Sequence, residues 1–340
     1  MRKQNKKVLV IRCGLLGDTV DATSVIEPLL EYFGKNTEIY WVSKPGVSEL
    51  FKYDSRVTKV YSLKHTKLPF YLNIGKCKII LDSFIKPFDL ILNLEIGTKF
   101  NDIVSLSKSH YKIGMPYEFI SDDIFKEHRV KHQLRILDKF CNNYSKDKAI
   151  PSIVGEPIHN IRNKFPLQNE YIVMCPTNSH VDNNNHRGYR SWPIENWRGL
   201  IKKIVNETKL NIILVGNSDE KQYFKSFEDL IDNHRTYNLC GNTSISELIS
   251  IMASSSHVIA TDSGSVHVAG ASAKRIISIH GPTNYYQSAP FETKNNQVKI
   301  ATLDLPCSPC YDTEVIRKCR KNICMQDLSS EQVFDILRSF

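Results

Sequence analysis

Short apolar runs alternate with longer amphipathic stretches along the whole chain. The runs are rich in β-branched residues, as in buried strands, whereas the longer stretches repeat their apolar residues at helical spacing. This alternation is typical of βα units wound around a parallel sheet. We expect strands at 8–12, 39–43, 59–63, 90–95 and 111–115, and again at 171–177, 212–216, 237–241, 257–262 and 275–281.

The same pattern divides the chain into two halves. Periodicity fades between 147 and 168, where Pro151, Gly155, Pro157 and Pro166 interrupt it. A chain of 340 residues is also longer than one hydrophobic core usually serves. The sequence therefore predicts the α/β fold class, with two doubly wound domains joined by a linker.

Two helices have recognisable limits in the sequence. The helix after the first strand is predicted to begin near Asp18 and to stop at Gly34, because glycine commonly follows the last helical turn. The last helix is predicted to begin near Ser329 and to run to the C-terminus. Both would pack an apolar face against a sheet.

Composition excludes several classes of protein. Charged residues make up 24% and hydrophobic residues 41% of the chain, which favours a globular protein over a disordered or fibrous one. No apolar run approaches the ~18 residues that cross a bilayer, and the best candidate, 8–16, is broken by Arg12. No small-residue cleavage site follows the basic N-terminus, so we expect a mature cytoplasmic chain. Nine cysteines, an odd number, favour reduced thiols over a disulfide framework.

The formal charge of +9 is concentrated in the first half of the chain. Residues 1–160 carry 25 basic against 18 acidic residues, whereas residues 161–340 carry 20 against 18. Between Arg56 and Lys86, seven cations and several aromatic rings accompany a single acid, Asp82. Such a mixture suits an anionic partner or the headgroup region of a membrane, and the alternative is an ordinary solvated basic face.

The turn after the first strand reads Gly14-Leu-Leu-Gly17-Asp18. It is neither the Gly-x-Gly-x-x-Gly dinucleotide fingerprint nor a P-loop, because the glycine spacing and the lysine are missing. Open α/β sheets bind ligands at the carboxyl ends of their strands, so Asp18 stands where a general base acts on a bound substrate. The alternative is that Asp18 only caps the following helix.

The strongest local signal is the segment Asp262-Ser263-Gly264-Ser265-Val266-His267. A strand ends at Asp262, and a helix follows whose free N–H groups would face the same edge of the sheet. Such a helix N-terminus suits a phosphate, Ser263 and Gly264 let a diphosphate come close, and His267 lies one turn further along. The alternative is an ordinary Asp or Ser cap beside a packed histidine.

Other strand ends add polar groups to this edge. Thr177 suits a hydrogen bond to a phosphate, and Arg190, in the loop that follows, suits its charge. Glu220 follows the next strand, where an acid accepts from ribose hydroxyls, and Gly281-Pro282-Thr283 adds a further polar turn. The alternatives without a binding role are that Arg190 is solvated and that Glu220 belongs to the acidic first turn of a helix.

Taken in order, these segments resemble glycosyltransferase family 9, the ADP-heptose:lipopolysaccharide heptosyltransferases. The resemblance runs from about Val8 to the final helix and rests on order and spacing, since no single motif is specific. The motifs are Gly14-x-x-Gly17-Asp18, Arg190-Ser-Trp-Pro-Ile-Glu-Asn-Trp197, Leu214-Val-Gly216, Asp262-Ser-Gly-Ser-Val-His267 with Ala269, Gly281-Pro-Thr283 and Pro306-Cys-Ser-Pro-Cys310.

The resemblance implies a GT-B fold, in which two Rossmann-like doubly wound domains face each other across a cleft. Residues 1–155 would bind the acceptor and residues 165–325 the nucleotide sugar. Residues 326–340 would form a C-terminal helix that crosses back to the N-terminal domain. The resemblance also implies an inverting transfer that requires no cofactor.

Roles for individual residues follow from the resemblance as well. Asp18 matches the catalytic aspartate that deprotonates the acceptor hydroxyl. Arg190 stands where the family carries a lysine near the diphosphate, and Glu220 is a looser match to the acid near the ribose. With Thr177 included, the expected donor-binding residues are Thr177, Arg190, Glu220, Asp262, Ser263, Gly264 and His267.

The expected function is transfer of a heptose from ADP-heptose to the lipopolysaccharide inner core, with Kdo or heptose as acceptor. The enzyme would act at the cytoplasmic face of the inner membrane, as a peripheral protein, and Lys64 and Lys67 would contact a lipid-linked anionic acceptor. Arg190 in place of lysine and a long loop at 181–189 leave another nucleotide sugar open, as well as a capsule or protein acceptor. A nucleotide-sugar epimerase and a nucleic-acid-binding protein stay open too, but no nucleic-acid-binding module is recognisable and we expect no nucleic-acid partner.

Four cysteines form a late cluster, Cys307-x2-Cys310-x8-Cys319-x4-Cys324. The first pair has the spacing of a metal knuckle, so one interpretation is a structural zinc or iron. The other is a set of reduced structural thiols. Metal analysis of protein purified without added zinc distinguishes the two.

Overall fold

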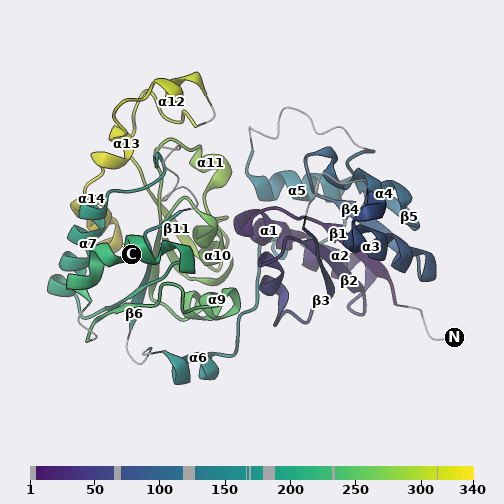
Figure 1. The fold of residues 1–340 in the computed structure, drawn as a ribbon, viewed down its shortest axis with the longest axis horizontal. Helices are drawn as coiled ribbons and strands as arrows, with labels where there is room; N and C mark the ends of the chain where they lie inside the picture. The colour runs from purple at the N-terminus through teal and green to yellow at the C-terminus, as the bar shows by residue number, and fades with distance from the viewer. Residues whose placement is uncertain are drawn as a thin grey trace. The chain divides into compact units, whose positions relative to one another are not determined.

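The computed structural model describes residues 5–64, 70–117, 127–165, 167, 170–178, 188–231, 234–311 and 313–340. The chain divides into two compact units, unit 1 (Met1–Val154) and unit 2 (Gly155–Phe340), and each is built on one parallel sheet with helices around it (Figure 1). The division lies inside the segment 147–168, where the sequence predicts a linker. Within the described ranges, no helix is both long and apolar enough to cross a membrane.

Unit 1 contains a five-stranded sheet of order β3-β2-β1-β4-β5. β1 lies in the middle because its run of Val, Leu and Ile is buried on both faces, as expected for a central parallel strand. All five predicted strands are confirmed, with ends that differ by at most two residues. The strands are β1 (Lys7–Ile11), β2 (Glu38–Ser43), β3 (Val57–Ser62), β4 (Phe88–Asn93) and β5 (Ser109–Gly114).

Helices complete the core of unit 1. Alternate residues of β1 point to opposite faces of the sheet, and Leu9 and Ile11 share one apolar cluster with residues of α3 and α4. Val8 and Val10 are fully buried on the other face. The helices are α1 (Leu16–Ala22), α2 (Ile26–Phe33), α3 (Ile74–Ile85), α4 (Asn101–Leu106) and α5 (Arg129–Asp138).

The helical segment after β1 corrects one prediction. α1 begins at Leu16, two residues before Asp18, and a 3-10 turn (Thr23–Val25) separates it from α2. Pro28 explains the break, because a proline inside one continuous helix would lose a hydrogen bond, whereas here it lies in the first turn of α2. The predicted stop at Gly34 is confirmed.

Unit 2 contains a six-stranded sheet of order β11-β10-β9-β6-β7-β8, in which every pairing is parallel. The five strands predicted for this half are confirmed. β11 was not predicted, because its mixed run of Gln, Val, Lys, Ile and Ala forms a partly exposed edge strand. The strands are β6 (Tyr171–Cys175), β7 (Asn211–Leu214), β8 (Thr236–Asn238), β9 (His257–Thr261), β10 (Arg275–Ile279) and β11 (Gln297–Ala301).

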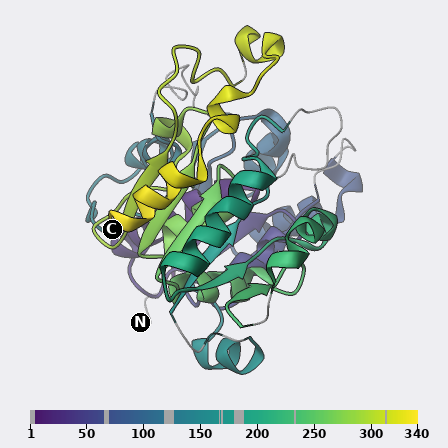
Figure 2. The same ribbon diagram turned by 90° about the vertical axis from the view of Figure 1, so that its left-hand side faces the viewer.

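The final helix of the chain, α14, packs within unit 2. It lies alongside α7 (Figure 2), and its buried Val333, Phe334 and Leu337 join the apolar core of this unit. The prediction that residues 326–340 reach the N-terminal domain stays a prediction. The helices of unit 2 are α6 (Ile158–Lys164), α7 (Ile194–Glu207), α8 (Lys221–Phe224), α9 (Ile245–Ala253), α10 (Gly264–Ser272), α11 (Tyr285–Ser288), α12 (Glu314–Lys318), α13 (Ile323–Gln326) and α14 (Ser330–Arg338).

Two buried histidines make stability depend on pH. Burial lowers the pKa of His257 in β9 and of His132 in α5 to about 4. The unfolded chain therefore binds these protons at a higher pH than the folded chain. Above about pH 6.5 both histidines are neutral in both states and do not reduce the free energy of unfolding. As the pH falls from 6.5 toward 4, protonation of the unfolded chain lowers that free energy. We expect the free energy of unfolding in urea to fall by roughly 1.4 kcal/mol per pH unit for each histidine in this interval.

A pair of variants checks this pH dependence. His257→Gln should make the fall in unfolding free energy less steep between pH 6.5 and 4, because it removes one of the groups that titrate in this interval. The same change at exposed His159 should leave the slope as it is. Equal slopes for the wild type and H257Q would contradict the assignment.

Candidate active site

Asp18 lies in the first turn of α1, just beyond the carboxyl end of β1. The strand order of unit 1 reverses between β1 and β4, and such a topological switch point is where open α/β sheets bind ligands. Gly14 allows the turn to close over the carboxylate, since a Cβ at this position would stand 2.8 Å from the Asp18 Cβ. The glycine of the motif therefore serves the placement of the acid.

Two arginines contact the same oxygen of Asp18. Arg12 Nη2 is 3.1 Å and Arg129 Nη1 is 3.4 Å from Asp18 Oδ1, while Oδ2 accepts a hydrogen bond from the Leu15 N–H at 3.1 Å. Asp18 thus makes the backbone contact that the capping interpretation predicts. It also makes two ion pairs that a cap does not require. About a quarter of its side chain stays exposed, so the oriented carboxylate can meet a substrate.

Arg12 ties the loops after β1 and β4 together. Its side chain is buried, and Nη1 donates to the Leu94 carbonyl at 3.1 Å and lies 3.8 Å from Glu95 Oε1. The same Glu95 oxygen accepts from the Cys13 N–H at 2.7 Å. Sequence reasoning treated Arg12 only as a break in an apolar run. A buried charge directly after a central strand was the available signal of a functional role, because such a charge requires partners.

The second switch point lies in unit 2, between β6 and β9. Thr177 follows β6 and Asp262 follows β9, and the Thr261 hydroxyl donates to the Thr177 carbonyl at 3.2 Å. Both Thr177 and Asp262 are buried. Two of the predicted donor-binding residues are therefore brought together at the ligand-binding edge of this sheet.

α10 begins at this edge without a side-chain cap. Ser263 occupies the N-cap position in extended backbone, yet its hydroxyl makes no capping hydrogen bond, and Ser263 Oγ is buried without a partner. Gly264 is the first residue of the helix, and His267 is buried one turn along it. The alternative of an ordinary serine cap is therefore wrong. An uncapped helix N-terminus beside an unsatisfied hydroxyl is a site for an anion such as a phosphate.

Asp262 is held as a carboxylate by the groups around it. Burial by itself would raise its pKa, but His280, Arg190 and His267, together with a hydrogen bond from Thr283, lower the pKa below its usual value. Arg190 Nη1 lies 3.6 Å from Asp262 Oδ2. Asp262 therefore orients Arg190 at the edge where α10 begins.

Two further residues complete this part of the site, and sequence reasoning missed both. The centre of the Tyr311 ring lies 5.3 Å from the Arg190 guanidinium carbon, which is a cation–π contact. His280 follows β10 and is fully buried, and burial lowers its pKa. Its Nδ1 lies 3.1 Å from Thr283 Oγ1. A histidine directly after a strand and before the turn at 281–283 was the available signal.

Thr177 and Glu220 are joined by a hydrogen bond. The Thr177 hydroxyl donates to Glu220 Oε2 at 2.8 Å, and the Asn217 N–H donates to the same oxygen at 2.8 Å. A Cβ at Gly216 would stand 2.7 Å from this oxygen, so glycine is required where β7 ends. The acidic first-turn interpretation holds in part, since Glu220 does support its own turn. It also reaches Thr177, which a solvated first-turn acid would not.

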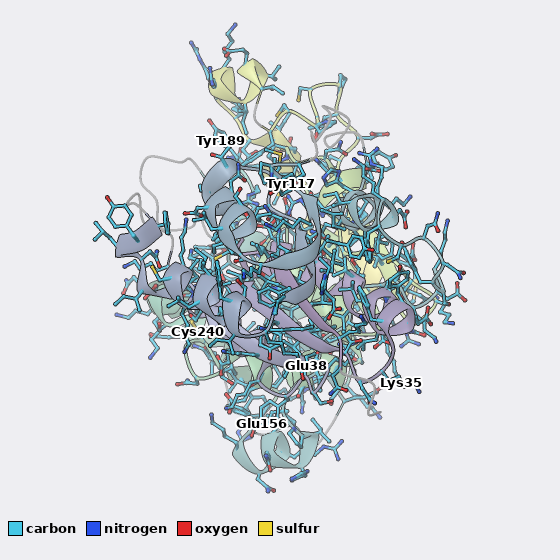
Figure 3. The ribbon with its side chains drawn as sticks, turned by 90° about the vertical axis from the view of Figure 1, so that its right-hand side faces the viewer. Lys35, Glu38, Tyr117, Glu156, Tyr189 and Cys240 are labelled. Atoms are coloured by element: carbon cyan, nitrogen blue, oxygen red, sulfur yellow. The ribbon has the colours of Figure 1, made fainter. Side chains whose placement is uncertain are left out.

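The predicted acceptor residues lie in unit 1. Lys64 is exposed, and Lys67 lies outside the described residues. Within the basic segment Arg56–Lys86, four cations pair with acids from elsewhere in the chain or from α3. These pairs are Arg56 with Glu27 and Asp54, Lys59 with Asp82, Lys76 with Asp102, and Lys86 with Glu38, which is labelled in Figure 3. The positive charge that the basic segment offers to a partner is therefore smaller than the sequence predicts, because these four cations are paired with acids within the fold.

The four late cysteines line one cavity of about 370 Å³ beside α12 and α13. Their sulfurs are not arranged as metal ligands, since no group of three potential ligands gathers within the described residues. Cys319 Sγ donates to the Lys321 carbonyl at 3.1 Å and Cys324 Sγ to Asn322 Oδ1 at 3.2 Å, as protonated thiols do. Burial raises the pKa of Cys324 to about 11, which also favours the thiol. A zinc or iron there stays a prediction that metal analysis tests.

Comparison with known proteins finds lipopolysaccharide and lipooligosaccharide heptosyltransferases among the relatives. Lipooligosaccharide heptosyltransferase 2 of Campylobacter jejuni is 33% identical over 106 residues, which are 31% of this chain and 32% of that protein. The match to this relative thus spans about a third of its length. Lipopolysaccharide core heptosyltransferase OpsX of Haemophilus influenzae is 21% identical over 305 residues, covering 87% of this chain and 84% of that protein.

Solved structures share the whole fold. The family 9 glycosyl transferase of Veillonella parvula superimposes with a TM-score of 0.81 at 15% identity, over 100% of this chain and 98% of that one. ADP-heptose lipopolysaccharide heptosyltransferase II of E. coli gives 0.77 at 16% identity, over 98% of each chain. The predicted α/β fold of GT-B type is confirmed. The family model described as glycosyltransferase family 9 (heptosyltransferase) matches residues 104–320, more than half of the chain. The chain therefore belongs to glycosyltransferase family 9.

Proposed function

We propose that this protein is an inverting heptosyltransferase that transfers heptose from ADP-heptose to the inner core of lipopolysaccharide, with Kdo or heptose as acceptor. The names of its relatives support the reaction class, and the E. coli neighbour of the same fold is an ADP-heptose enzyme. We also propose that it works at the cytoplasmic face of the inner membrane, where a lipid-linked acceptor is held.

The open N-terminus of α10 is the observation that carries this proposal. It combines a helix dipole, a buried hydroxyl without a partner on Ser263 and the oriented cation Arg190 at one switch point. These are the groups that bind a diphosphate and stabilise the charge that develops on it as the sugar leaves. Asp262 contributes by holding Arg190, and the hydrogen-bonded pair of Thr177 and Glu220 would meet the remaining polar groups of the nucleotide.

Asp18 acts on the acceptor, as the general base of the transfer. The acceptor hydroxyl oxygen forms a bond to the anomeric carbon while the bond from that carbon to the diphosphate oxygen breaks. The hydroxyl proton passes to the Asp18 carboxylate, and ADP leaves with the bonding electrons. Attack opposite to the leaving group inverts the configuration. Arg12 and Arg129 orient the carboxylate so that its exposed side meets the acceptor.

Incubation of the full chain with ADP-heptose and a panel of truncated lipopolysaccharide cores tests this function. We expect ADP release that requires an acceptor, and a product whose anomeric configuration is inverted relative to the donor. Conversion of ADP-heptose without any acceptor would instead favour a nucleotide-sugar epimerase. Transfer from another nucleotide sugar, or to a capsule or protein acceptor, would keep the fold and correct the substrate.

A further inference from the structure

α3 in unit 1 carries several large apolar residues on its outer face. Positions 74, 78, 81 and 85 share one face of this helix, because residues three, four and seven apart are neighbours on a helix surface. Ile74, Leu81 and Ile85 are 85%, 63% and 84% exposed. Ile79 of α3 is fully buried in the core, as expected for a surface helix, so the exposed residues form a second apolar stripe that faces outward.

Contacts on the inward face of α3 fix the helix in the orientation that leaves its apolar stripe exposed. Lys76 on that face is buried and pairs with Asp102 at 2.6 Å, and its Nζ also donates to the Lys99 carbonyl at 2.8 Å. Ser83, fully buried, accepts a hydrogen bond from the Lys108 N–H at 2.8 Å. Rotating the helix would break these contacts and remove Ile79 from the apolar core.

Neighbouring side chains extend the stripe into a surface. Tyr71 and Leu72, from the 3-10 turn before α3, are 66% and 57% exposed, and Phe84 is 54% exposed. We call Tyr71, Leu72, Ile74, Lys78, Leu81, Phe84 and Ile85 the α3 surface. A surface of clustered large apolar side chains is unusual on a protein that stays in water.

The charges at the α3 surface are cationic. Lys78 is exposed within the apolar stripe itself, and Lys108 Nζ lies 4.7 Å from the centre of the Phe84 ring. The two acids nearest to this surface, Asp82 and Asp102, are paired within the fold. Asp82 accepts from the Tyr61 hydroxyl at 2.6 Å and from Lys59 at 2.8 Å, and Asp102 pairs with buried Lys76. Apolar side chains with lysines among them complement a layer of anionic headgroups above acyl chains.

We propose that the α3 surface binds an anionic lipid bilayer, with α3 lying in the plane of the headgroups and its apolar stripe at the boundary with the acyl chains. The inference rests on the proposed function, because a lipid-linked acceptor is what brings the chain to a membrane. It adds the part of the molecule that makes the contact.

The position of Lys78 favours a bilayer over a second copy of this chain. In a symmetric dimer through the α3 surface, Lys78 in the middle of the stripe would be desolvated close to its own copy, and like charges there oppose association. On a bilayer the long lysine side chain reaches a phosphate while its neighbours stay in the apolar layer. Lysine is also depleted from the centres of protein interfaces.

Vesicle flotation with the full chain tests this proposal. Vesicles of phosphatidylcholine with phosphatidylglycerol should bind the wild type, and phosphatidylcholine alone should bind it less. Ile74→Ser with Ile85→Ser should weaken binding on the order of tenfold or more, because two large apolar side chains no longer enter the bilayer. Lys78→Glu should weaken binding only to the anionic vesicles. The matched controls are Val315→Ser, an exposed apolar residue of α12, and Lys35→Glu, an exposed lysine after α2 that is labelled in Figure 3.

The outcomes separate this proposal from the proposed function. Affinity for ADP and transfer to a water-soluble acceptor, measured on the same preparations, should be unchanged in the α3 variants. If the Ile74→Ser/Ile85→Ser variant bound anionic vesicles as tightly as the wild type does, the proposal would be overturned. The proposal would also be overturned if the wild type did not bind vesicles but formed a dimer that the serine variant does not form. The α3 surface would then join two copies of the chain. A chain that binds vesicles but neither ADP nor any acceptor would contradict the proposed function alone.

Discussion

Replacing Asp18 with asparagine will lower heptosyl transfer by roughly 10²–10⁴-fold, the range that a positioned general base contributes. The amide keeps the size of the side chain, and its oxygen can still accept from the Leu15 N–H that Asp18 now binds at 3.1 Å. It cannot take the acceptor's proton. Affinity for ADP should be nearly intact, because Asp18 lies in unit 1 and the proposed nucleotide groups lie in unit 2. Turnover of ADP-heptose and calorimetric titration with ADP measure the two quantities.

The interpretation of this variant needs a matched control. Asp335→Asn makes the same chemical change on the exposed side of α14 and should leave both turnover and ADP affinity as in the wild type. Circular dichroism of both variants checks that the fold is kept. If D18N turns over ADP-heptose at the wild-type rate, Asp18 is not the base, and its ion pairs with Arg12 and Arg129 are structural.

Replacing Arg190 with alanine is expected to weaken both donor binding and turnover, with the turnover falling on the order of 10²–10³-fold, as when a preorganised electrostatic contact is removed. Arg190 is oriented by Asp262 at 3.6 Å and by the Tyr311 ring, at the same edge as the open end of α10. The charge that develops on the departing diphosphate would lose its cation. Initial rates at varied ADP-heptose concentration separate the effect on KM from that on kcat.

Two companion variants make the Arg190 result specific. Arg190→Lys should recover part of the turnover, because a lysine supplies the charge without the paired N–H groups. Arg162→Ala removes an exposed arginine of α6 and should change neither constant. A loss in R190A that is confined to the KM of the acceptor would place Arg190 away from the donor and contradict the proposed site.

Ten strands of the fold could be predicted because their signal is local. Buried parallel strands must be apolar on both faces, so runs such as that of β1 are visible without any knowledge of their neighbours. The strand ends then pointed to Asp18 and to the start of α10, since the carboxyl edge of such sheets binds ligands. β11 was not predicted, because a partly exposed edge strand needs no continuous apolar run.

The partners of the candidate residues could not be predicted in this way. Arg129 meets Asp18 from a position 111 residues away, and Arg12 reaches Leu94 across 82. The charge of the basic segment also depends on distant residues, since Glu27 and Asp102 neutralise two of its cations. Counting charges along the chain overestimated the cationic surface, because ion pairs form across the fold and not along the sequence.

The sequence by itself determined the two α/β units and the family to which the chain belongs, and it predicted the edge of each sheet that carries the candidate site, because each rests on short apolar runs and turn residues. Only the tertiary structure decided that Ser263 leaves α10 uncapped and that Arg190 contacts both Asp262 and Tyr311. It also decided that α3 turns Lys76 inward and Ile74 and Ile85 outward. A residue's chemistry is local, but the burial and the partners that direct it come from segments that meet only when the chain folds.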